Sequence, residues 1–196
     1  MTGKDVLRLQ LDGSFNLIRA RLEGLGDEEW DRRALLGTSK LGFILWHCVR
    51  IVDWTVHSAM AGQPEVADGP RWRERFPRSA LYGAGIPDSV ADEVTRATSR
   101  TEAVDYLDDV RVAAIAWLDS QPETVLDARV PLQANQAARP DYLEPAVWAE
   151  VRDLDGLPAW QFLARPAISH IRVHAGEFDV LLQALRSQAT QAGLPG

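Results

Sequence analysis

The chain has 196 residues, of which 46% are hydrophobic and 25% charged, and its formal net charge is −7 at pH 7. This length and composition predict one soluble globular domain spanning residues 1–196. The acidic balance excludes nucleic acid as a partner, because phosphate contacts need a basic surface. No run reaches the roughly 18 apolar residues that a membrane span requires, so no membrane partner is expected either.

Two further features indicate the compartment. The first residues, MTGKDVLRLQLDGSF, mix charges into their apolar positions and lack the apolar core and cleavage site of a secretory signal. The lone Cys48 cannot form an internal disulfide. We therefore expect a cytoplasmic protein.

The N-terminal third predicts two helices. Residues 4–25 carry apolar side chains at spacings of three and four, which is typical of an amphipathic helix, until Gly26 interrupts the pattern. A second helix is predicted over residues 40–60, with Thr38 and Ser39 as candidate N-caps. The first stripe consists of Leu7, Leu11, Phe15, Ile18, Leu22 and Leu25.

Two more helices are predicted in the second half of the chain. Ser99 and Glu102 have the spacing of a capping box at the start of a helix over residues 99–120. The last helix covers residues 160–186, within which Pro166 either kinks the helix or marks its true start.

The remaining segments are long connections. Residues 62–89 are rich in Pro and Gly and predict a connection with short helical turns. Residues 122–158 keep no sustained period and predict an ordered excursion, with short extended pieces at residues 124–132 and 146–152. The predicted fold is therefore an all-α four-helix bundle with long second and third connections.

Three of the four histidines point to one metal site. His170 and His174 are four residues apart in HIRVH, so their side chains lie on one face of the last helix, about 6 Å apart along its axis. His47 falls on the apolar face of the second helix. Buried imidazoles need a partner for each nitrogen, and an ion shared by all three would satisfy them. We predict a divalent metal, such as Zn, Ni or Fe, bound by this triad.

Each of these residues also has a simpler explanation. A lone inward histidine is usually a hydrogen-bonded core residue, and histidines four apart also occur on solvated helix faces. Glu177 shares the ligand face, where it is a fourth ligand, an acceptor for a ligand imidazole, or a partner of an arginine. His57 and Asp53 lie off the face of His47, so His57 is excluded as a ligand and Asp53 is interpreted as solvated or salt-bridged. Cys48 is interpreted as a small buried hydrophobe.

Two segments carry a resemblance to a known family. LGFILWHCVRIVDWTVHSAM, followed more than a hundred residues later by FLARPAISHIRVHAGEFDVLLQALR, resembles the DinB/YfiT-like superfamily of metal-binding four-helix proteins. The HxxxHxGxF pattern is its most specific part, and the superfamily's ligands map onto His47, His170 and His174. Residues 62–98 and 122–150 match nothing recognisable.

The resemblance implies an activity as well as a fold. The superfamily includes S-transferases that use low-molecular-weight thiols such as mycothiol or bacillithiol. The resemblance also implies a homodimer. A thiol-dependent isomerase branch has Glu where this chain has His170, which favours thiol transfer to an electrophile. A metal-dependent hydrolase and a non-catalytic metal-binding stress protein are the alternatives. An open coordination position favours an enzyme, whereas a fourth ligand such as Glu177 favours the binding protein.

Overall fold

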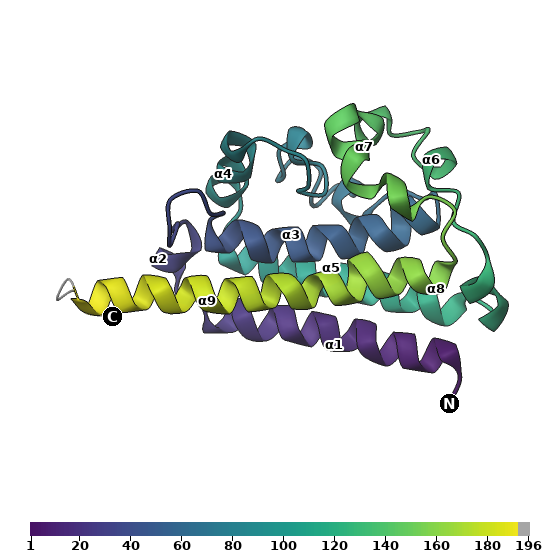
Figure 1. Ribbon diagram of the computed structural model, residues 1–196, viewed down its shortest axis with the longest axis horizontal. Coiled ribbons are helices and arrows are strands. Elements are labelled where there is room, and N and C mark those ends of the chain that lie inside the picture. Colours follow the sequence, from purple (N-terminus) through teal and green to yellow (C-terminus); the bar gives the residue numbers. More distant parts are fainter. Residues whose placement is uncertain (192–196) are drawn as a thin grey trace.

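Long helical segments run side by side along the longest axis of the molecule and form its core (Figure 1). They are taken from a computed structural model that describes residues 1–191. Within this range the protein is all-helical apart from one isolated β-bridge between Arg129 and Pro158, which confirms the predicted all-α bundle. The core segments are α1 (Gly3–Gly24), α3 (Leu41–Asp53) with its π-helical continuation η1 (Trp54–Met60), α5 (Arg100–Ser120), and α8 (Ala159–Phe162) with the π-helix η7 (Leu163–Ser169) and α9 (His170–Gln191).

The start of α5 follows local chemistry, whereas the start of α3 depends on a tertiary contact. Ser99 and Glu102 form the predicted capping box of α5. Thr38 and Ser39 are not the N-caps of α3, so that prediction was wrong: the N-cap is Lys40, which makes no side-chain cap. The backbone N–H of Leu41 donates instead to the carbonyl of Arg32, because the preceding loop folds back onto the helix end.

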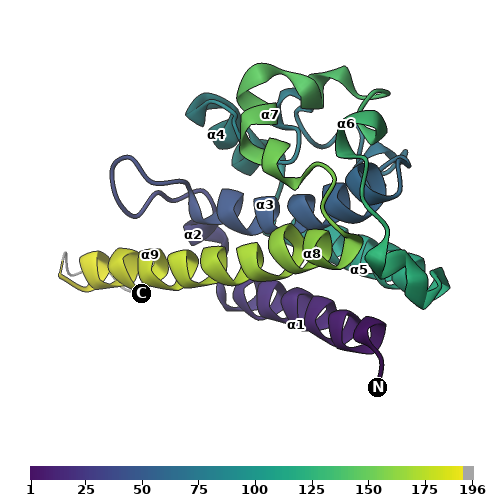
Figure 2. The same cartoon turned by 45° about the vertical axis from the view of Figure 1, so that its right-hand side comes forward.

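The two long connections lie on the same side of the bundle, over α3 (Figures 1 and 2). The predicted extended piece at 146–152 was wrong, because this segment is helical. Of the piece at 124–132, the first residues are helical, and only the backbone around Arg129 is extended, where it pairs with the segment around Pro158. A helix at residues 88–97 was missed. The first, shorter connection contains α2 (Asp27–Trp30). The two long connections contain η2 (Val66–Asp68), η3 (Arg78–Ala80), α4 (Asp88–Ala97), η4 (Glu123–Asp127), α6 (Leu132–Asn135), η5 (Pro140–Leu143), α7 (Pro145–Val151) and η6 (Arg152–Leu154).

Helix α3 is the centre of the molecule. Every residue from Leu41 to Asp53 is buried, because the bundle covers one side of the helix and the connections cover the other. Polar side chains on this helix are therefore removed from water and need partners inside the protein. They divide into two groups, one around His47 and one around Arg50 and Asp53.

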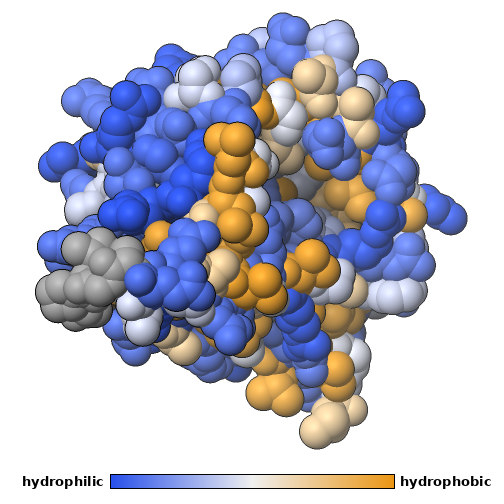
Figure 3. All heavy atoms as spheres, turned by 60° about the vertical axis from the view of Figure 1, so that its left-hand side comes forward, coloured by the Kyte–Doolittle hydropathy of each residue, from blue (hydrophilic) through white to orange (hydrophobic). Residues whose placement is uncertain are grey.

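The surface carries scattered apolar side chains. On the face toward which the C-terminal end of α9 points, hydrophobic residues form a band beside a hollow in an otherwise largely polar surface (Figure 3). Of the seven tryptophans only Trp160 is exposed, at 43%. Among the described residues, no helix has the length and apolarity needed to cross a membrane.

Candidate metal centre

Histidines from two helices meet in the centre of the bundle. His47 on α3, and His170 and His174 on α9, each bring a ring nitrogen to within 4.8 Å of the others. The Nε2 atoms of His47 and His170 are 3.0 Å apart, and the ring centroids of His170 and His174 are separated by 4.4 Å. The structure thus brings together the three predicted residues.

The start of α9 is shaped by the segment before it. Pro166 lies inside the π-helix η7, where its missing N–H would break an ordinary α-helical ladder. The helical segment continues through it, so Pro166 neither starts nor ends the helix, and regular α-helix begins at His170. Such π-helical insertions are frequent at functional sites, because they shift the register of the side chains that follow.

Hydrogen bonds fix the orientation of two of the imidazoles. Nδ1 of His47 lies 2.7 Å from the carbonyl oxygen of Tyr82, and Nδ1 of His174 lies 2.7 Å from a carboxylate oxygen of Glu177. A carbonyl or carboxylate oxygen only accepts, so Nδ1 of each ring carries the proton. The lone pair of each ring is consequently on Nε2, which is the form that binds a metal.

Burial keeps the imidazole rings of His47 and His170 neutral. Desolvation, followed by the nearby His174 and His170, lowers the pKa of His47 to about 3. Desolvation and His174 lower the pKa of His170 to about 4. Both rings are therefore unprotonated near pH 7, and their lone pairs are available to a cation.

The spacing also suits a shared ion. Two nitrogens bound to one metal at about 2.1 Å in a tetrahedral site are about 3.4 Å apart, close to the 3.0 Å between Nε2 of His47 and Nε2 of His170. His47 is 5% exposed, while the side chain of His174 is 23% exposed, so the cluster extends from the interior to a partly exposed ring on α9. The three residues thus fit a divalent ion.

The neighbouring candidates lie outside this cluster. Glu177 binds Nδ1 of His174, on the other side of the ring from Nε2, so it orients a ligand and is not grouped with the three imidazoles. Cys48 is buried, and burial raises the pKa of its thiol well above the ordinary value. His57 is not part of the three-histidine cluster, and its Nδ1 lies 2.8 Å from a carboxylate oxygen of Asp53.

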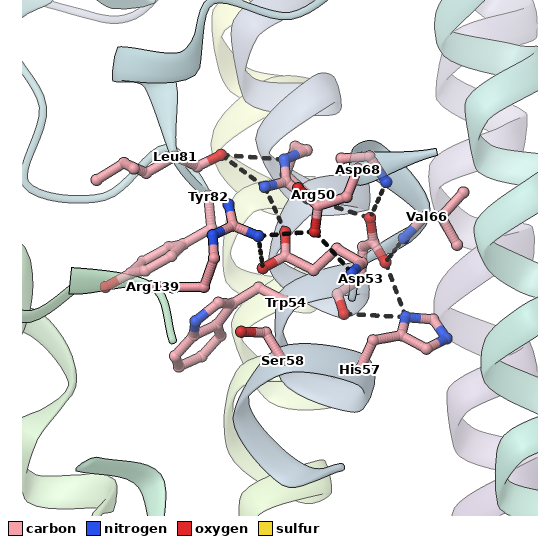
Figure 4. Close-up of polar contacts among 12 residues, drawn as sticks. Arg50, Asp53, Trp54, His57, Ser58, Val66, Asp68, Leu81, Tyr82 and Arg139 are labelled. Carbon is pink, nitrogen blue, oxygen red and sulfur yellow. Dashed lines mark hydrogen bonds and ion pairs between the residues drawn. The ribbon is translucent and has the colours of Figure 1, made fainter. Parts of the chain in front are cut away.

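Asp53 belongs to a second, buried polar group (Figure 4). It is salt-bridged to Arg50 at 3.1 Å, as one of the two interpretations predicted, but it is fully buried and not solvated. Its carboxylate also accepts the backbone N–H groups of Val66 and Ala67, which attaches the first connection to α3. Burial raises the pKa of Asp53, but the hydrogen bond from His57 and the charge of Arg50 outweigh it, so the pKa is lowered.

The backbone contribution to the site was not predicted from the sequence. The carbonyl of Tyr82 lies in the connection over residues 62–89, and a carbonyl contact leaves no mark on residue type. Gly83 was the one available signal: a Cβ built there would lie 2.5 Å from Nδ1 of His47. A glycine at this position allows the backbone to approach the imidazole.

These features define a class of protein: an all-helical bundle with three inward histidines, two of them on its last long helix. A family model described as the DinB superfamily matches residues 10–177. The chain belongs to the DinB superfamily. No curated protein and no solved structure gives a significant match to it.

Proposed function

We propose that the protein is a divalent-metal-dependent enzyme whose ion is held by His47, His170 and His174. The observation that carries this proposal is the convergence of one imidazole nitrogen from each of three histidines within 4.8 Å. The unprotonated rings of His47 and His170 offer lone pairs in the interior, and a cation shared with His174 is a partner that satisfies them.

The reaction proposed is transfer of a low-molecular-weight thiol, of the mycothiol or bacillithiol type, to an electrophile. When bound, a divalent ion with three neutral ligands supplies a strong Lewis acid that lowers the pKa of a coordinated thiol. The chain's own residues hold the ligand rings in place: Tyr82 orients His47, and Glu177 orients His174. The partial exposure of His174 leaves a side on which small molecules can reach the cluster.

The thiol must come from a cosubstrate. Cys48 is the only cysteine of the chain, and it is buried with its pKa raised. A buried neutral thiol is a poor nucleophile. We therefore expect Cys48→Ala to leave the transfer rate nearly unchanged.

The position of Glu177 bears on the competing functions. In a closed, non-catalytic metal site a fourth protein ligand is expected. Glu177 hydrogen-bonds to Nδ1 of His174 and is not part of the three-residue cluster, which favours a site open to exogenous ligands. A metal-bound water would suit the same open position, so a metal-dependent hydrolase is the second candidate.

The test begins with protein purified without an affinity tag. We expect elemental analysis to find about one divalent ion per chain, with the ion lost on chelation and restored by adding back the metal. A screen that pairs thiols with electrophiles, run beside an ester-hydrolysis assay, then distinguishes the two reactions. Thiol transfer at the full rate by the metal-free protein would refute the proposed mechanism, and a metal-loaded protein inactive in both assays would support the non-catalytic alternative.

We also propose a homodimer. Of the seven tryptophans only Trp160 is exposed, so the tryptophans do not supply an apolar surface for it. Exposed apolar residues on two of the long helices do: Val6, Leu9, Val173 and Val180. Light scattering at micromolar concentration should give twice the 21.7 kDa chain mass, and a monomer mass would contradict the proposal.

A further inference from the structure

The backbone is unusual where it meets His47. Leu81 has φ +49° and is the only non-glycine residue with positive φ in the described part of the chain. Gly83, two residues later, has φ +95°. A leucine in this region is sterically disfavoured and persists only where its surroundings hold it. The turn Leu81–Gly83 must therefore be held by other contacts.

Hydrogen bonds from Arg50 hold this turn in place. Its Nε and one terminal nitrogen donate to the carbonyl oxygen of Leu81 at 3.0 and 2.8 Å (Figure 4). The guanidinium is buried and paired with Asp53 at 3.1 Å and with Glu65 at 2.6 Å. A planar guanidinium with its other donors occupied is a rigid fork, so the Leu81 carbonyl has one place to bind.

The residue after Leu81 makes the contact with the proposed ligand. The carbonyl of Tyr82 accepts the Nδ1 proton of His47, and Gly83 packs against the same ring. Arg50 lies three residues after His47 on α3, so the helix and the turn are joined at adjacent points. A change at the Leu81 carbonyl would thus be transmitted within one residue to the acceptor of His47.

We propose that Arg50 is a positioning residue of the metal centre. By donating two hydrogen bonds to the Leu81 carbonyl, it holds the turn Leu81–Gly83 in its observed conformation. This conformation places the Tyr82 carbonyl against Nδ1 of His47 and so keeps the lone pair of that ring on Nε2. The role of Arg50 at a metal centre rests on the proposed function. Its effect on which nitrogen of His47 carries the proton does not require a bound ion.

The first test uses the metal-free protein. Nitrogen-15 NMR of the imidazole rings should find His47 with its proton on Nδ1 and show a slowly exchanging N–H close to Tyr82 and Gly83. A ring with its proton on Nε2, or one exchanging between both forms, in the wild-type protein would overturn the proposal without any variant. This readout does not depend on metal binding, so it separates failure of the positioning role from failure of the proposed function.

Gly83→Ala tests the turn, with Gly85→Ala as its matched control. Both glycines have positive φ, and an added Cβ would meet His47 Nδ1 at 2.5 Å in the first case and the Ala146 carbonyl at 2.8 Å in the second. The two variants therefore impose similar local strain, but only Gly83→Ala displaces the turn from His47. We expect zinc affinity to fall about 10- to 100-fold in Gly83→Ala, as when outer hydrogen bonds to ligands are lost, and to change less than about 3-fold in Gly85→Ala.

Arg50→Lys tests the clasp itself. A lysine keeps the positive charge beside Asp53 and Glu65 but cannot form the two-pronged contact with Leu81. Tyr142→Phe is the control, because it removes a hydroxyl that contacts Arg50 and Glu65 and leaves the Leu81 contact in place. We expect a mixed protonation of the His47 ring in Arg50→Lys and the wild-type form in Tyr142→Phe. A folded Arg50→Lys protein with the wild-type ring form and zinc affinity would overturn the proposal, and if it does not fold, the wild-type NMR measurement and Gly83→Ala decide.

Discussion

Two buried histidines on the same helical segment, His47 and His57, lie in opposite electrostatic environments. His47 faces two other imidazoles, and burial with these neighbours lowers its pKa to about 3. His57 is also buried, which lowers its pKa, but its contact with Asp53 reverses the effect and raises the pKa overall. Burial alone therefore does not decide the role of a histidine. The neighbouring groups make one ring a neutral electron-pair donor and the other a partner of a carboxylate.

The largest effect on stability is expected among the buried charged residues around Arg50 and Asp53. Asp53→Ala should destabilise the fold by about 3 kcal/mol, because the buried Arg50 loses one of its two counter-charges and the backbone of Val66 and Ala67 loses an acceptor. The change in the free energy of unfolding is measured by urea denaturation. The control is Asp105→Ala, which removes an exposed partner of Arg71 and should cost less than about 1 kcal/mol. Equal losses in the two variants would mean that the buried group is not a distinct source of stability.

The next largest difference is expected in zinc affinity, between variants of His47 and His57. His47→Ala leaves only two ligands, both on α9, so we expect zinc affinity to fall by more than about 100-fold, beyond the effect of losing an outer hydrogen bond. His57→Ala is the matched control and should bind zinc as the wild type does, with only its stability reduced. Calorimetric titration of the two variants gives the comparison, and similar affinities would remove His47 from the site.

The pH dependence of stability should have opposite signs in the two regions. In the metal-free protein, His47 and His170 take up protons when unfolded near pH 6.5 but not when folded until about pH 4 or below. Stability from this region is therefore lost as the pH falls below 6.5, by up to about 1.4 kcal/mol per pH unit for each ring. His57 has a raised folded pKa, so its contribution is fully present below pH 6.5 and is lost as the pH rises through that folded pKa.

Urea midpoints between pH 5 and 8 can resolve these contributions. The variant His47→Ala should flatten the acid side of the stability profile, and His57→Ala should flatten the alkaline side. Excess zinc should move the acid-side loss to lower pH for the wild type, because the ion competes with protons for the same nitrogens. A profile unaffected by either variant would show that neither ring has a shifted pKa.

The smallest effect concerns Glu177. Replacing it with Ala removes the acceptor for the Nδ1 proton of His174, and we expect zinc affinity to fall about 10-fold. Glu177→Gln keeps an acceptor oxygen and should lose less. Asp179→Ala is the control on the same helix, because Asp179 pairs with Arg21 and not with a histidine. If Asp179→Ala weakens binding as much as Glu177→Ala, the effect is general charge and not ring orientation.

The outcome of the sequence predictions follows the range of the interactions involved. The long helices and the capping box at Ser99 and Glu102 were predicted because periodicity and caps are local properties. The convergence of the three histidines was predicted because each lies on an apolar helix face, and such faces must meet in a bundle. The N-cap of α3 was predicted wrongly, since a distant backbone carbonyl replaced the expected side chain.

By itself, the sequence determined the all-helical fold, the inward direction of His47, His170 and His174, and membership of the DinB superfamily. Only the tertiary structure decided which nitrogen is free in the rings of His47 and His174. That choice depends on the carbonyl of Tyr82, the carboxylate of Glu177 and the clasp of Arg50 on Leu81. Side-chain periodicity follows from the geometry of one helix, whereas the position of a backbone acceptor depends on how a long connection folds across its neighbours, and residue types do not record it.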